Sequence, residues 1–376
     1  MNHDDSHKLQ AVENTGEVDR TRPRKHLEDA ACGENIKPVS ISDVARLAGV
    51  SVGTVSRTLN SVGYIKKETR ERVEKAAREL NYVPNRAGRI LKTNQTKLIM
   101  LAIPDTDNEI YFGMIKGVLN VIKQNGYSLL LYYTDAQENE EFHAVKLLQE
   151  RLIDGLILVH FHYSQALMTE IENAPGPIVL IGMCNHMWKG QRYHFDTVSI
   201  DVYKGIFDAV EHLIRMGHRK IVYLAGRNGI EVYQQRYRGY RDALEKYNIP
   251  YREDYVFWHD FTEAGGYASG REAYLMNDRA TAICASNDLQ AIGCWEAIKD
   301  LGGKIPGDIA LTGMDNIKIT RILNITSLDM HETEMGATAA ELLMGHLVGK
   351  KQTYLDIFFA PVLQIHESSL YSKTMT

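Results

Sequence analysis

The residues with the clearest chemical purpose are the small polar side chains of a ten-residue segment, Ser51 to Asn60, which reads SVGTVSRTLN. Helical spacing turns Val55 and Leu59 towards an interior. The residues left outside are Gly53, Ser56, Arg57 and Asn60. Small residues let a helix approach the major groove of DNA closely, and an arginine can reach guanine or phosphate there. The segment therefore predicts a helix that reads DNA.

The elements that must position this helix lie on both sides of it. A first helix is predicted by apolar residues at helical spacing, which are Ile41, Val44, Ala45 and Ala48. Gly49 then breaks the pattern, as a tight turn requires, and the hydroxyl of Ser51 can cap the next helix. A third helix is expected over residues 67–80. Together these elements predict a helix-turn-helix domain over residues 37–84.

The charge of the chain is distributed unevenly. The 376 residues carry a net charge of -5, yet Lys37 to Gln95 holds 12 Lys and Arg residues against 5 Asp and Glu residues. This basic segment is followed by an acidic body, so we expect only the head to bind a polyanion. Residues 1–36 lack periodicity and are expected to form a disordered tail.

From Lys97 onward, short apolar runs alternate with amphipathic segments. The predicted strands are Leu98–Ile103, Ser128–Tyr133, Leu156–Val159, Ile178–Ile181, Ile221–Ala225, Tyr255–Trp258, Ala282–Ala285 and Ile309–Thr312. The predicted helices lie near residues 111–125, 140–151, 203–216, 234–247, 264–276, 288–301 and 332–348. Such alternation is typical of an α/β fold, in which parallel sheets are covered by helices on both faces.

The length of this body indicates two lobes rather than one small sheet. We expect an effector-binding and dimerisation core over residues 97–370. Its N-lobe would comprise about 97–200 and 305–330, and its C-lobe about 201–304 and 331–370. Ligands of parallel α/β folds bind beyond the carboxyl ends of the strands, so a cleft between the lobes is the expected site.

Residues 85–96 join the head to the body as a hinge helix or linker. Asn85 to Lys92 reads NRAGRILK, about two helical turns, and a helix that short is marginal in isolation. Gly88 weakens it by about 1 kcal/mol relative to alanine. We expect a linker that becomes helical on DNA, with Leu91 wedged between base pairs in the minor groove. The alternative is a flexible tether with an incidental leucine.

Several function classes lack their sequence signals. No run of 18 apolar residues predicts a membrane span, and no apolar signal core begins the chain, so a cytoplasmic protein is expected. The four cysteines have no CxxC spacing and are expected to be reduced. The enzyme motifs GxSxG, GxxxxGK[ST] and HExxH are absent, so we expect neither catalysis nor a cofactor.

One metal alternative is open. His160 and His162 form an HxH pair, with His194 and Asp196 elsewhere in the chain. Alternation at a strand end explains the pair adequately, so no metal site is expected. A sugar-binding protein is a second alternative, because a two-lobed body suits it, but the basic head argues against that class.

The chain resembles the lactose-repressor/galactose-repressor family of bacterial transcription regulators from Lys37 to about residue 370. The family motif IxDVAxxAGVSxxTVSRxLN is matched from Ile41 to Asn60. Further matches are Thr69-Arg70, Leu80-Asn81-Tyr82, Pro84-Asn85, Gly217-His218-Arg219, Arg236, Gly239-Tyr240, Asn287-Asp288, Gly313 and Asp315. The resemblance implies a helix-turn-helix head and a two-lobed core like the type I periplasmic binding proteins.

The resemblance also implies roles on DNA. The residues that would hold phosphates are Ser40, Ser51, Thr54, Ser56, Asn60, Thr69, Tyr82 and Asn85. Val52, Gly53 and Arg57 occupy the positions that read bases, and Leu91 the position of an intercalating leucine. Val52 offers only apolar contact and Gly53 has no side chain, so reading would depend on Arg57 and on DNA shape.

For the effector, Arg236 and Asp288 match the principal binding pair of the family, and an arginine with an aspartate can clamp neighbouring hydroxyls. The resemblance places Phe261 on the ligand face and Tyr111 and Phe112 at the rim of the opposite lobe. Core packing is the alternative for each of these aromatic residues.

Two departures bear on the effector. Gly182 stands where many sugar-binding members have an aspartate. Ile230 and Val232 occupy the positions at which the purine-repressor branch of the family has polar residues that bind the purine. This argues against a nucleobase as the effector. The resemblance implies a carbohydrate effector.

The function expected from these features is that of a homodimeric repressor of carbohydrate-utilisation genes. It would bind a pseudo-palindromic operator in double-stranded DNA and leave it when a sugar binds. The alternatives are a corepressor-dependent regulator with a non-sugar effector, or a cytosolic sugar-binding protein.

Overall fold

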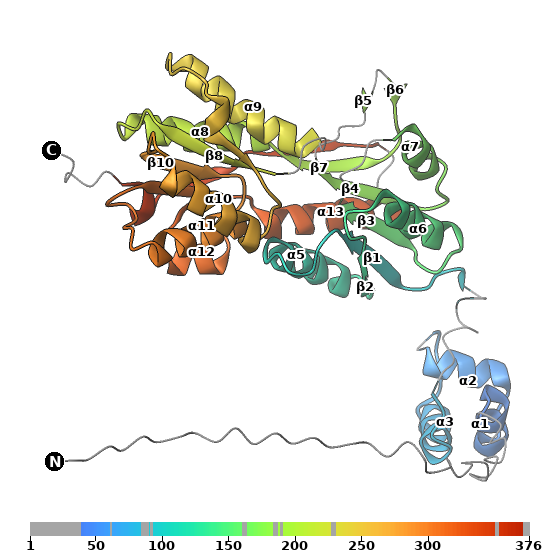
Figure 1. Cartoon of the computed structure of the whole chain (residues 1–376). Coiled ribbons are helices and arrows are strands. Elements are labelled where there is room, and N and C mark those ends of the chain that lie inside the picture. The colour runs from blue at the N-terminus through green and yellow to red at the C-terminus, as the bar shows by residue number, and fades with distance from the viewer. Residues whose placement is uncertain are drawn as a thin grey trace, which may run out of the picture. The chain divides into compact units, whose positions relative to one another are not determined.

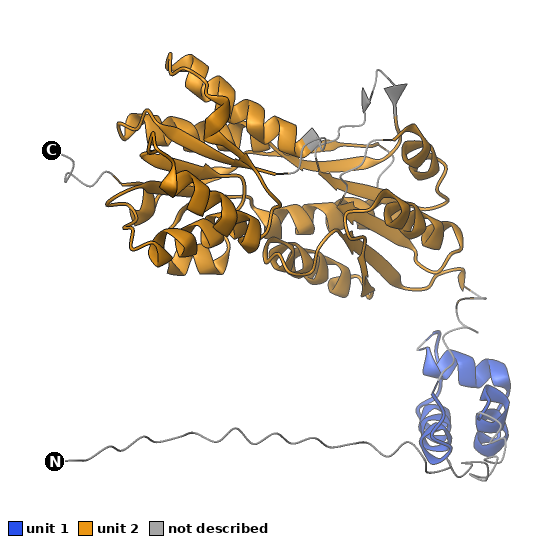
Figure 2. Cartoon of the chain, in the orientation of Figure 1, with its two compact units in different colours: residues 1–85 blue, residues 86–376 orange. Residues whose placement is uncertain are grey.

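The computed structural model of the chain describes residues 39–60, 62–83, 90, 93–159, 164–182, 187–188, 191–226, 231–349 and 353–370. The chain forms two compact units, Met1–Asn85 and Arg86–Thr376 (Figure 2). Each unit has its own hydrophobic core.

The first unit is a bundle of three short helices, α1 (Ile41–Ala48), α2 (Val52–Leu59) and α3 (Lys67–Glu79). Its fully buried apolar side chains are Val44, Ala45, Ala48, Val55, Val73, Ala76 and Ala77. Gly49 ends α1 in the left-handed conformation with φ of 62°, where a side chain would be strained. The three predicted helices and their inward faces are confirmed.

The second unit contains two six-stranded sheets, which define two lobes (Figure 1). The N-lobe sheet has the order β13-β7-β4-β3-β1-β2 and is parallel throughout. Its strands are β1 (Leu98–Ile103), β2 (Ser128–Tyr133), β3 (Gly155–Val159), β4 (Ile178–Gly182), β7 (Asp196–Ile200) and β13 (Asp356–Phe359). A separate antiparallel pair is formed by β5 (Met187–Trp188) and β6 (Gln191–Arg192).

Helices pack on both faces of the N-lobe sheet. Alternate residues of β1 face opposite ways, so Ile99 and Leu101 join one core while Met100 and Ala102 join the other. The helices of the first core are α5 (Ile110–Gln124) and α13 (Glu332–Leu347). Those of the second are α6 (Glu138–Gln149) and α7 (Gln165–Glu172).

The C-lobe sheet has the order β14-β12-β11-β10-β8-β9, and only the β14 pairing is antiparallel. Its strands are β8 (Ile221–Ala225), β9 (Val256–Trp258), β10 (Ala282–Ala285), β11 (Ala310–Asp315), β12 (Thr326–Asp329) and β14 (Val362–Gln364). The helices of this lobe are α8 (Val202–Arg215), α9 (Glu231–Lys246), α10 (Glu263–Leu275), α11 (Asp288–Asp300) and α12 (Lys318–Ile322). Two 3-10 turns, Glu253–Tyr255 and Glu367–Ser369, complete it.

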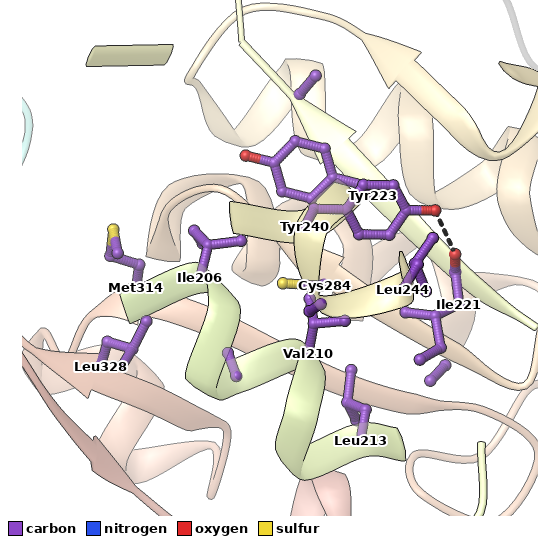
Figure 3. Close-up of a cluster of buried hydrophobic side chains, with 14 of the residues drawn as sticks. Ile206, Val210, Leu213, Ile221, Tyr223, Tyr240, Leu244, Cys284, Met314 and Leu328 are labelled. Atoms are coloured by element: carbon purple, nitrogen blue, oxygen red, sulfur yellow. Dashed lines mark hydrogen bonds between the residues drawn. The ribbon is translucent and has the colours of Figure 1, made fainter. Parts of the chain in front are cut away.

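One face of the C-lobe sheet is covered by α8 and α9, and in this core Tyr240 of α9 lies against Tyr223 of β8 (Figure 3). The rings of Tyr223 and Tyr240 stack with centroids 4.9 Å apart. The Tyr240 hydroxyl donates a hydrogen bond of 2.9 Å to the Ile221 carbonyl, which removes the cost of burying it. This packing fixes α9, which also carries Arg236, on the sheet.

The predicted division of the lobes is wrong in its C-terminal part. Residues 305–330 were expected in the N-lobe, but β11 and β12 belong to the C-lobe sheet. Residues 331–370 were expected in the C-lobe, but α13 and β13 belong to the N-lobe, and only β14 and the turn after it lie in the C-lobe. The chain crosses between lobes three times because each sheet takes its last strands from late in the sequence.

Most predicted elements are confirmed within two or three residues, but the expected strand Tyr255–Trp258 is shorter. Tyr255 ends a 3-10 turn, and the strand starts at Val256. The elements that the apolar runs did not indicate are β5, β6, β7, β12, β13, β14, α7 and α12. Within the described ranges, no helix is both long and apolar enough to cross a membrane.

Candidate functional sites: a DNA-reading face and an effector cleft

The first candidate site is the outer face of α2. Val52 is 41% exposed, Arg57 and Asn60 are exposed, and Thr54 and Ser56 are half-buried. The cap of the helix comes from Ser51, whose Oγ accepts a hydrogen bond from the Thr54 amide at 3.2 Å. The predicted polar face of α2 is therefore confirmed as an accessible surface.

The polar side chains of this face are held along the helix. The Nε atom of Arg57 donates to the Gly53 carbonyl at 3.4 Å, and Asn60 donates through Nδ2 to the Ser56 carbonyl at 2.8 Å. Arg57 has no acidic partner among the residues that the structure describes. Its guanidinium is thus free to meet an acceptor from outside the chain.

Gly53 is a glycine that the fold does not require. A Cβ atom added there would meet only the Ser51 hydroxyl, at 3.8 Å. Since glycine costs about 0.5–1 kcal/mol in a helix relative to alanine, a partner that approaches the backbone closely explains the choice better than packing does.

Gly53→Ala should therefore raise the stability of the head by about 0.5–1 kcal/mol and weaken its binding to DNA. Amide hydrogen exchange of α2 in the full-length protein would report the first effect, and titration with DNA the second. Ser42→Thr adds a methyl group to the exposed side of α1 and serves as the control. A more stable variant with unchanged DNA binding would contradict close approach at Gly53.

The remaining predicted DNA contacts surround α2. Ser40 lies at the start of α1, where its amide and Oγ donate to the Asp43 carboxylate at 3.0 and 2.6 Å. These hydrogen bonds, with help from Arg46, hold the pKa of Asp43 below its ordinary value. Thr69 and Tyr82 are half-buried, and Tyr82 packs against the head core. Asn85 and Leu91 lie outside the described residues.

Tyr64 has a place that the sequence patterns did not single out. It lies in the loop between α2 and α3 and is 92% exposed. The sequence signal for Tyr64 was an aromatic residue in a short polar loop, next to the helix that is predicted to read DNA. Its ring is accessible to a partner from outside the chain.

The second candidate site is a cleft between the two lobes of the second unit. It is lined by Ile110, Tyr111, Met114, Val159, Ile181, Gly182, Ile200, Val202, Val232, Arg236, Met330, Glu332 and Met335. Val159, Ile181, Gly182 and Ile200 stand at the carboxyl ends of their strands, where ligands of this fold class bind. Two of the three segments that cross between lobes, residues 200–202 and 330–331, form part of the wall.

Arg236 projects into this cleft from α9. Its Nη1 atom donates to the Ser286 carbonyl at 2.7 Å, and its Cζ atom lies 5.3 Å from the centroid of the Phe261 ring. The ring of Tyr233 packs on Phe261 from 4.2 Å. The Nε atom of Arg236 is buried and has no partner among the described residues. A fixed guanidinium with an unused donor is suited to hold a ligand oxygen.

Phe261 supports Arg236 rather than forming the cleft wall. A Cβ atom at Gly226 would come within 2.1 Å of the Phe261 ring, so only glycine leaves room for the ring there. Tyr111 lines the cleft, whereas Phe112 is 57% exposed and lies outside the lining. Of the three aromatic residues that the resemblance assigned to the ligand, the structure brings Tyr111 into the cleft.

Asp288 is not among the described residues that line the cleft, and its contact with the effector stays a prediction. The residue is fully buried, and its Oδ1 accepts from the Ser327 hydroxyl at 2.6 Å. Its Oδ2 accepts from the Ile317 amide and the Thr320 hydroxyl at 2.9 and 2.7 Å. Both oxygens are therefore used to hold the loop after β11 in place.

Asp315, at the end of β11, is a buried carboxylate that interacts electrostatically with Arg236. Burial raises the pKa of Asp315, the Arg236 charge opposes the rise, and the Asp288 charge adds to it. Its Oδ1 is buried without a hydrogen-bond partner in the described chain. Asp315 also has a φ of 123°, in a region that favours glycine, so the backbone is strained to place it. The match of Gly313 and Asp315 to the family pattern is the sequence signal for this residue.

Tyr111 links the two lobes electrostatically. Burial raises the pKa of its hydroxyl well above the ordinary value, and the charges of Asp315 and Asp105 add to the rise, while the Arg236 charge opposes it. Tyr111 belongs to the N-lobe, and Asp315 and Arg236 to the C-lobe. The polar end of the cleft thus depends on both lobes.

Of the four residues considered for a metal site, the structure describes His194 and Asp196, and both have partners within the protein. His194 bonds Glu172, and Asp196 accepts from His346 at 2.8 Å and from the Leu355 amide at 2.7 Å. His160 and His162 lie outside the described residues. In the part of the chain with described side chains, no three His, Cys, Asp or Glu residues gather as a metal would need.

Comparison with known proteins gives two matching domain families. The family described as bacterial regulatory proteins, lacI family, matches residues 40–85, and the periplasmic binding protein-like domain matches residues 210–369. The HTH-type transcriptional repressor PurR of Aliivibrio salmonicida (strain LFI1238) is 30% identical over 314 residues, which are 83% of this chain and 93% of PurR.

Two solved structures share the architecture. A complex of the transcriptional regulator CelR with cellobiose is 28% identical with a TM-score of 0.64, covering 88% of this chain and 99% of that one. A lac repressor dimer bound to operator and the anti-inducer ONPF has a TM-score of 0.76 and 24% identity, covering 89% of this chain and 100% of that one. The two-lobed α/β core with an N-terminal helix-turn-helix region is the fold that these proteins share.

Proposed function

Since the chain belongs to the lacI family of bacterial regulatory proteins and is a DNA-binding transcriptional repressor rather than an enzyme, we propose that a carbohydrate controls its hold on the operator. The sugar would enter the cleft between the lobes and release the protein from DNA. The regulated genes would be those of carbohydrate utilisation.

The observation that carries the effector class is a pair of polar groups, Arg236, which lines the cleft, and Asp315, whose pKa the Arg236 charge lowers. Among the residues that the structure describes, the buried Nε of Arg236, a donor, and the buried Oδ1 of Asp315, an acceptor, have no hydrogen-bond partner. A hydroxyl both donates and accepts, so adjacent hydroxyls of a sugar satisfy the two atoms together. A relative at 28% identity, CelR, is described as a complex with cellobiose, which supports the same class.

On DNA, α2 would lie in the major groove with Arg57 on a base edge and Val52 against a thymine methyl. The predicted phosphate contacts from Ser40, Ser51 and Thr69 would fix its register, and Tyr64 joins them as a candidate. We propose a homodimer in the cytoplasm, because two heads then match the two halves of a pseudo-palindrome. The lac repressor that shares the fold is described as a dimer bound to operator.

The proposal is tested by selecting palindromic duplexes that the full-length protein shifts in a gel, and then titrating neutral sugars into the complex. Release by a sugar supports the proposal. If a sugar instead increases the affinity for DNA, the protein is a corepressor-dependent regulator. If the protein shifts duplexes but no sugar changes its binding, the carbohydrate effector is overturned and the function as a DNA-binding repressor still stands.

Leu91, in the linker, is proposed to wedge between base pairs at the centre of the operator. Leu91→Ala should reduce the bend angle of bound DNA and weaken binding, because the unstacked step would lose its apolar partner. Circular-permutation gel shifts measure the angle. If the bend angle is unchanged, residues 85–96 are better explained as a flexible tether in which Leu91 has no contact with DNA.

Coupling of the cleft to the linker can be traced through Asp154, which stands immediately before β3. Its carboxylate accepts from the Thr96 amide, the Thr96 hydroxyl and the Lys97 amide at 2.7, 2.8 and 3.0 Å. Thr96 and Lys97 come at the end of the linker, and β3 ends at Val159 in the cleft wall. A shift of β3 on closure would therefore move the point where the linker leaves the N-lobe.

Asp154→Ala should leave sugar affinity unchanged and lower the coupling between sugar and DNA by about 1 kcal/mol, within the usual range of allosteric coupling energies. The operator affinity with and without saturating sugar gives the coupling. Glu150→Ala, an exposed acid four residues earlier, is the matched control. Full coupling in Asp154→Ala would exclude this route.

A further inference from the structure

A second cavity lies in the C-lobe, away from the effector cleft. Its volume is about 180 Å³, and it is lined by the segment 219–221, the second half of α9 and residues from the segment 249–255. Ile221 is the first residue of β8, so the cavity lies at the amino end of that strand, whereas the cleft lies at carboxyl ends. The described linings of the two cavities share no residue, and the second cavity is therefore a separate site.

The floor of the second cavity is apolar. It is formed by side chains that are buried or half-buried, which are Tyr240, Leu244, Ile249 and Tyr255. The Tyr240 hydroxyl donates to the Ile221 carbonyl and the Tyr255 hydroxyl to the Asp278 carbonyl, each at 2.9 Å. Both hydroxyl hydrogens are thus used inside the protein. A dry apolar cavity of about 150 Å³ holds benzene, so this cavity has room for a ligand with a single ring.

Three cations stand around this floor, and two of them have carboxylate partners. Lys220 and Arg252 both pair with Asp278, and their hydrogen bonds lower the pKa of Asp278 to about 2. Arg252 also pairs with Asp254 at 2.5 Å. These two cations are therefore matched by two ionised acids.

Arg219 is the third cation and differs from the other two. Its Nη1 atom donates to the backbone carbonyls of Ile214 and His218, at 2.8 and 2.9 Å. Among the residues that the structure describes, it has no acidic partner. The cavity thus carries one positive charge in excess, and this charge is that of Arg219.

A carboxylate matches this excess charge better than a phosphate does. An arginine can hold a carboxylate through two parallel hydrogen bonds. A phosphomonoester carries a charge of about -1.5 to -2 at neutral pH, so part of its charge would face Asp278 without compensation. Small-molecule sites combine mostly apolar walls with a few polar groups, and the apolar floor with Arg219 has this composition.

The helix α9 connects this cavity to the effector cleft. Arg236 lines the cleft, and Tyr240 and Leu244, further along the same helix, line the second cavity. Tyr240 stacks on Tyr223 (Figure 3), whose hydroxyl accepts from the Ser286 Oγ atom at 2.7 Å. The Ser286 carbonyl accepts from Arg236 at 2.7 Å. A ligand packed on Tyr240 therefore acts on the groups that hold Arg236.

We propose that this cavity is a second ligand site, which takes a monoanionic carboxylate with one aromatic or aliphatic ring. The carboxylate binds Arg219, the ring packs on the apolar floor, and α9 carries the effect of occupancy to Arg236. By linkage, an effector in the cleft changes the affinity of the second site to the same extent. The inference goes beyond the proposed function, because the site needs neither a sugar nor DNA to bind its ligand.

The test uses the full-length protein and ligand-observed nuclear magnetic resonance. The probes are benzoate, cyclohexanecarboxylate, benzamide, acetate and phenyl phosphate. Benzoate should bind about tenfold or more tightly than benzamide, which lacks the charge, and than acetate, which lacks the ring. Phenyl phosphate should bind more weakly than benzoate. If neither ring carboxylate binds, or if benzamide, acetate or phenyl phosphate binds as tightly as benzoate, the inference is overturned.

Variants locate the bound carboxylate. Arg219→Gln keeps hydrogen-bond donors and removes the charge, so the affinity for benzoate should fall about tenfold or more while the affinity for benzamide stays the same. Arg271→Gln makes the same change at an exposed position outside the cavity and serves as the control. Arg236→Ala should keep most of the benzoate affinity. Benzoate binding that survives Arg219→Gln in full, and is lost in Arg236→Ala instead, would place the carboxylate in the effector cleft and contradict a second site.

Amide hydrogen exchange tests the connection through α9. Benzoate should slow exchange of the α9 amides as far as Arg236, because a ligand on Tyr240 and Leu244 stabilises the helix that they belong to. Arg219→Gln should remove this protection at the same benzoate concentration. Protection confined to residues 249–255 would support the site and contradict its connection to the cleft.

Discussion

Arg57→Ala should lose about 1–3 kcal/mol of binding free energy on the best operator, and most of the loss should be confined to one base pair of each half-site. Arg57 is the one side chain at the predicted base-reading positions that can donate two hydrogen bonds, because Val52 is apolar and Gly53 has no side chain. Its guanidinium is exposed on α2 and lies over the Gly53 carbonyl.

The measurement is a set of operator affinities for duplexes substituted one base pair at a time, at fixed salt. Arg57→Lys is the matched variant, since it keeps the charge and loses the planar fork. It should retain most of the non-specific affinity and lose the discrimination. If Arg57→Ala instead weakens binding equally on every duplex and lowers the salt dependence by about one ion, Arg57 contacts phosphate.

The strands with continuous apolar runs were predictable because burial on both faces of a parallel sheet leaves little room for polar residues. β1 and β2 have the predicted bounds, Leu98–Ile103 and Ser128–Tyr133. β7 was missed because it alternates polar with apolar residues. Its buried Asp196 bonds His346 and its Thr197 hydroxyl donates to Asp356 at 2.6 Å, so partners distant in the sequence make these polar residues acceptable inside.

The lobe to which a late strand belongs was not predictable from its composition. β12 and β13 are separated by one helix, yet they lie in different sheets. The chain changes lobe at Met330–His331, and His331 adopts a left-handed φ of 52° there. Nothing in a local pattern shows that a histidine will take that conformation, because the packing of the two lobes imposes it.

The choice between two aspartates shows a similar limit in the cleft. Asp288 and Asp315 both follow a strand, and both match family residues. What separates them is whether the carboxylate is already used by Ser327, Thr320 and the Ile317 amide. These donors come from residues 29 to 39 positions away, so only the folded chain shows that Asp288 is saturated and Asp315 is not.

Arg236→Ala should abolish release of the operator at sugar concentrations that fully release the unmodified repressor, while operator affinity without sugar stays the same. Arg236 offers a charged donor with a buried Nε atom in the cleft wall, and a hydrogen bond to a charged group contributes about 1.5–3 kcal/mol. Its loss corresponds to a decrease of about 10- to 150-fold in sugar affinity. Removing Arg236 also leaves the buried Asp315 without the charge that lowers its pKa.

Two variants make the result interpretable. Arg238→Ala removes the same side chain from an exposed position on the same helix, so it should respond to sugar normally. Arg236→Ala combined with Asp315→Asn should cost less than the sum of the single changes, because the two residues would hold the same hydroxyls. Release of DNA by Arg236→Ala at unchanged sugar concentrations would place the effector elsewhere. If the free-energy costs of the two substitutions are strictly additive, Asp315 and Arg236 do not bind the same ligand hydroxyls, because two groups that hold one ligand do not act independently.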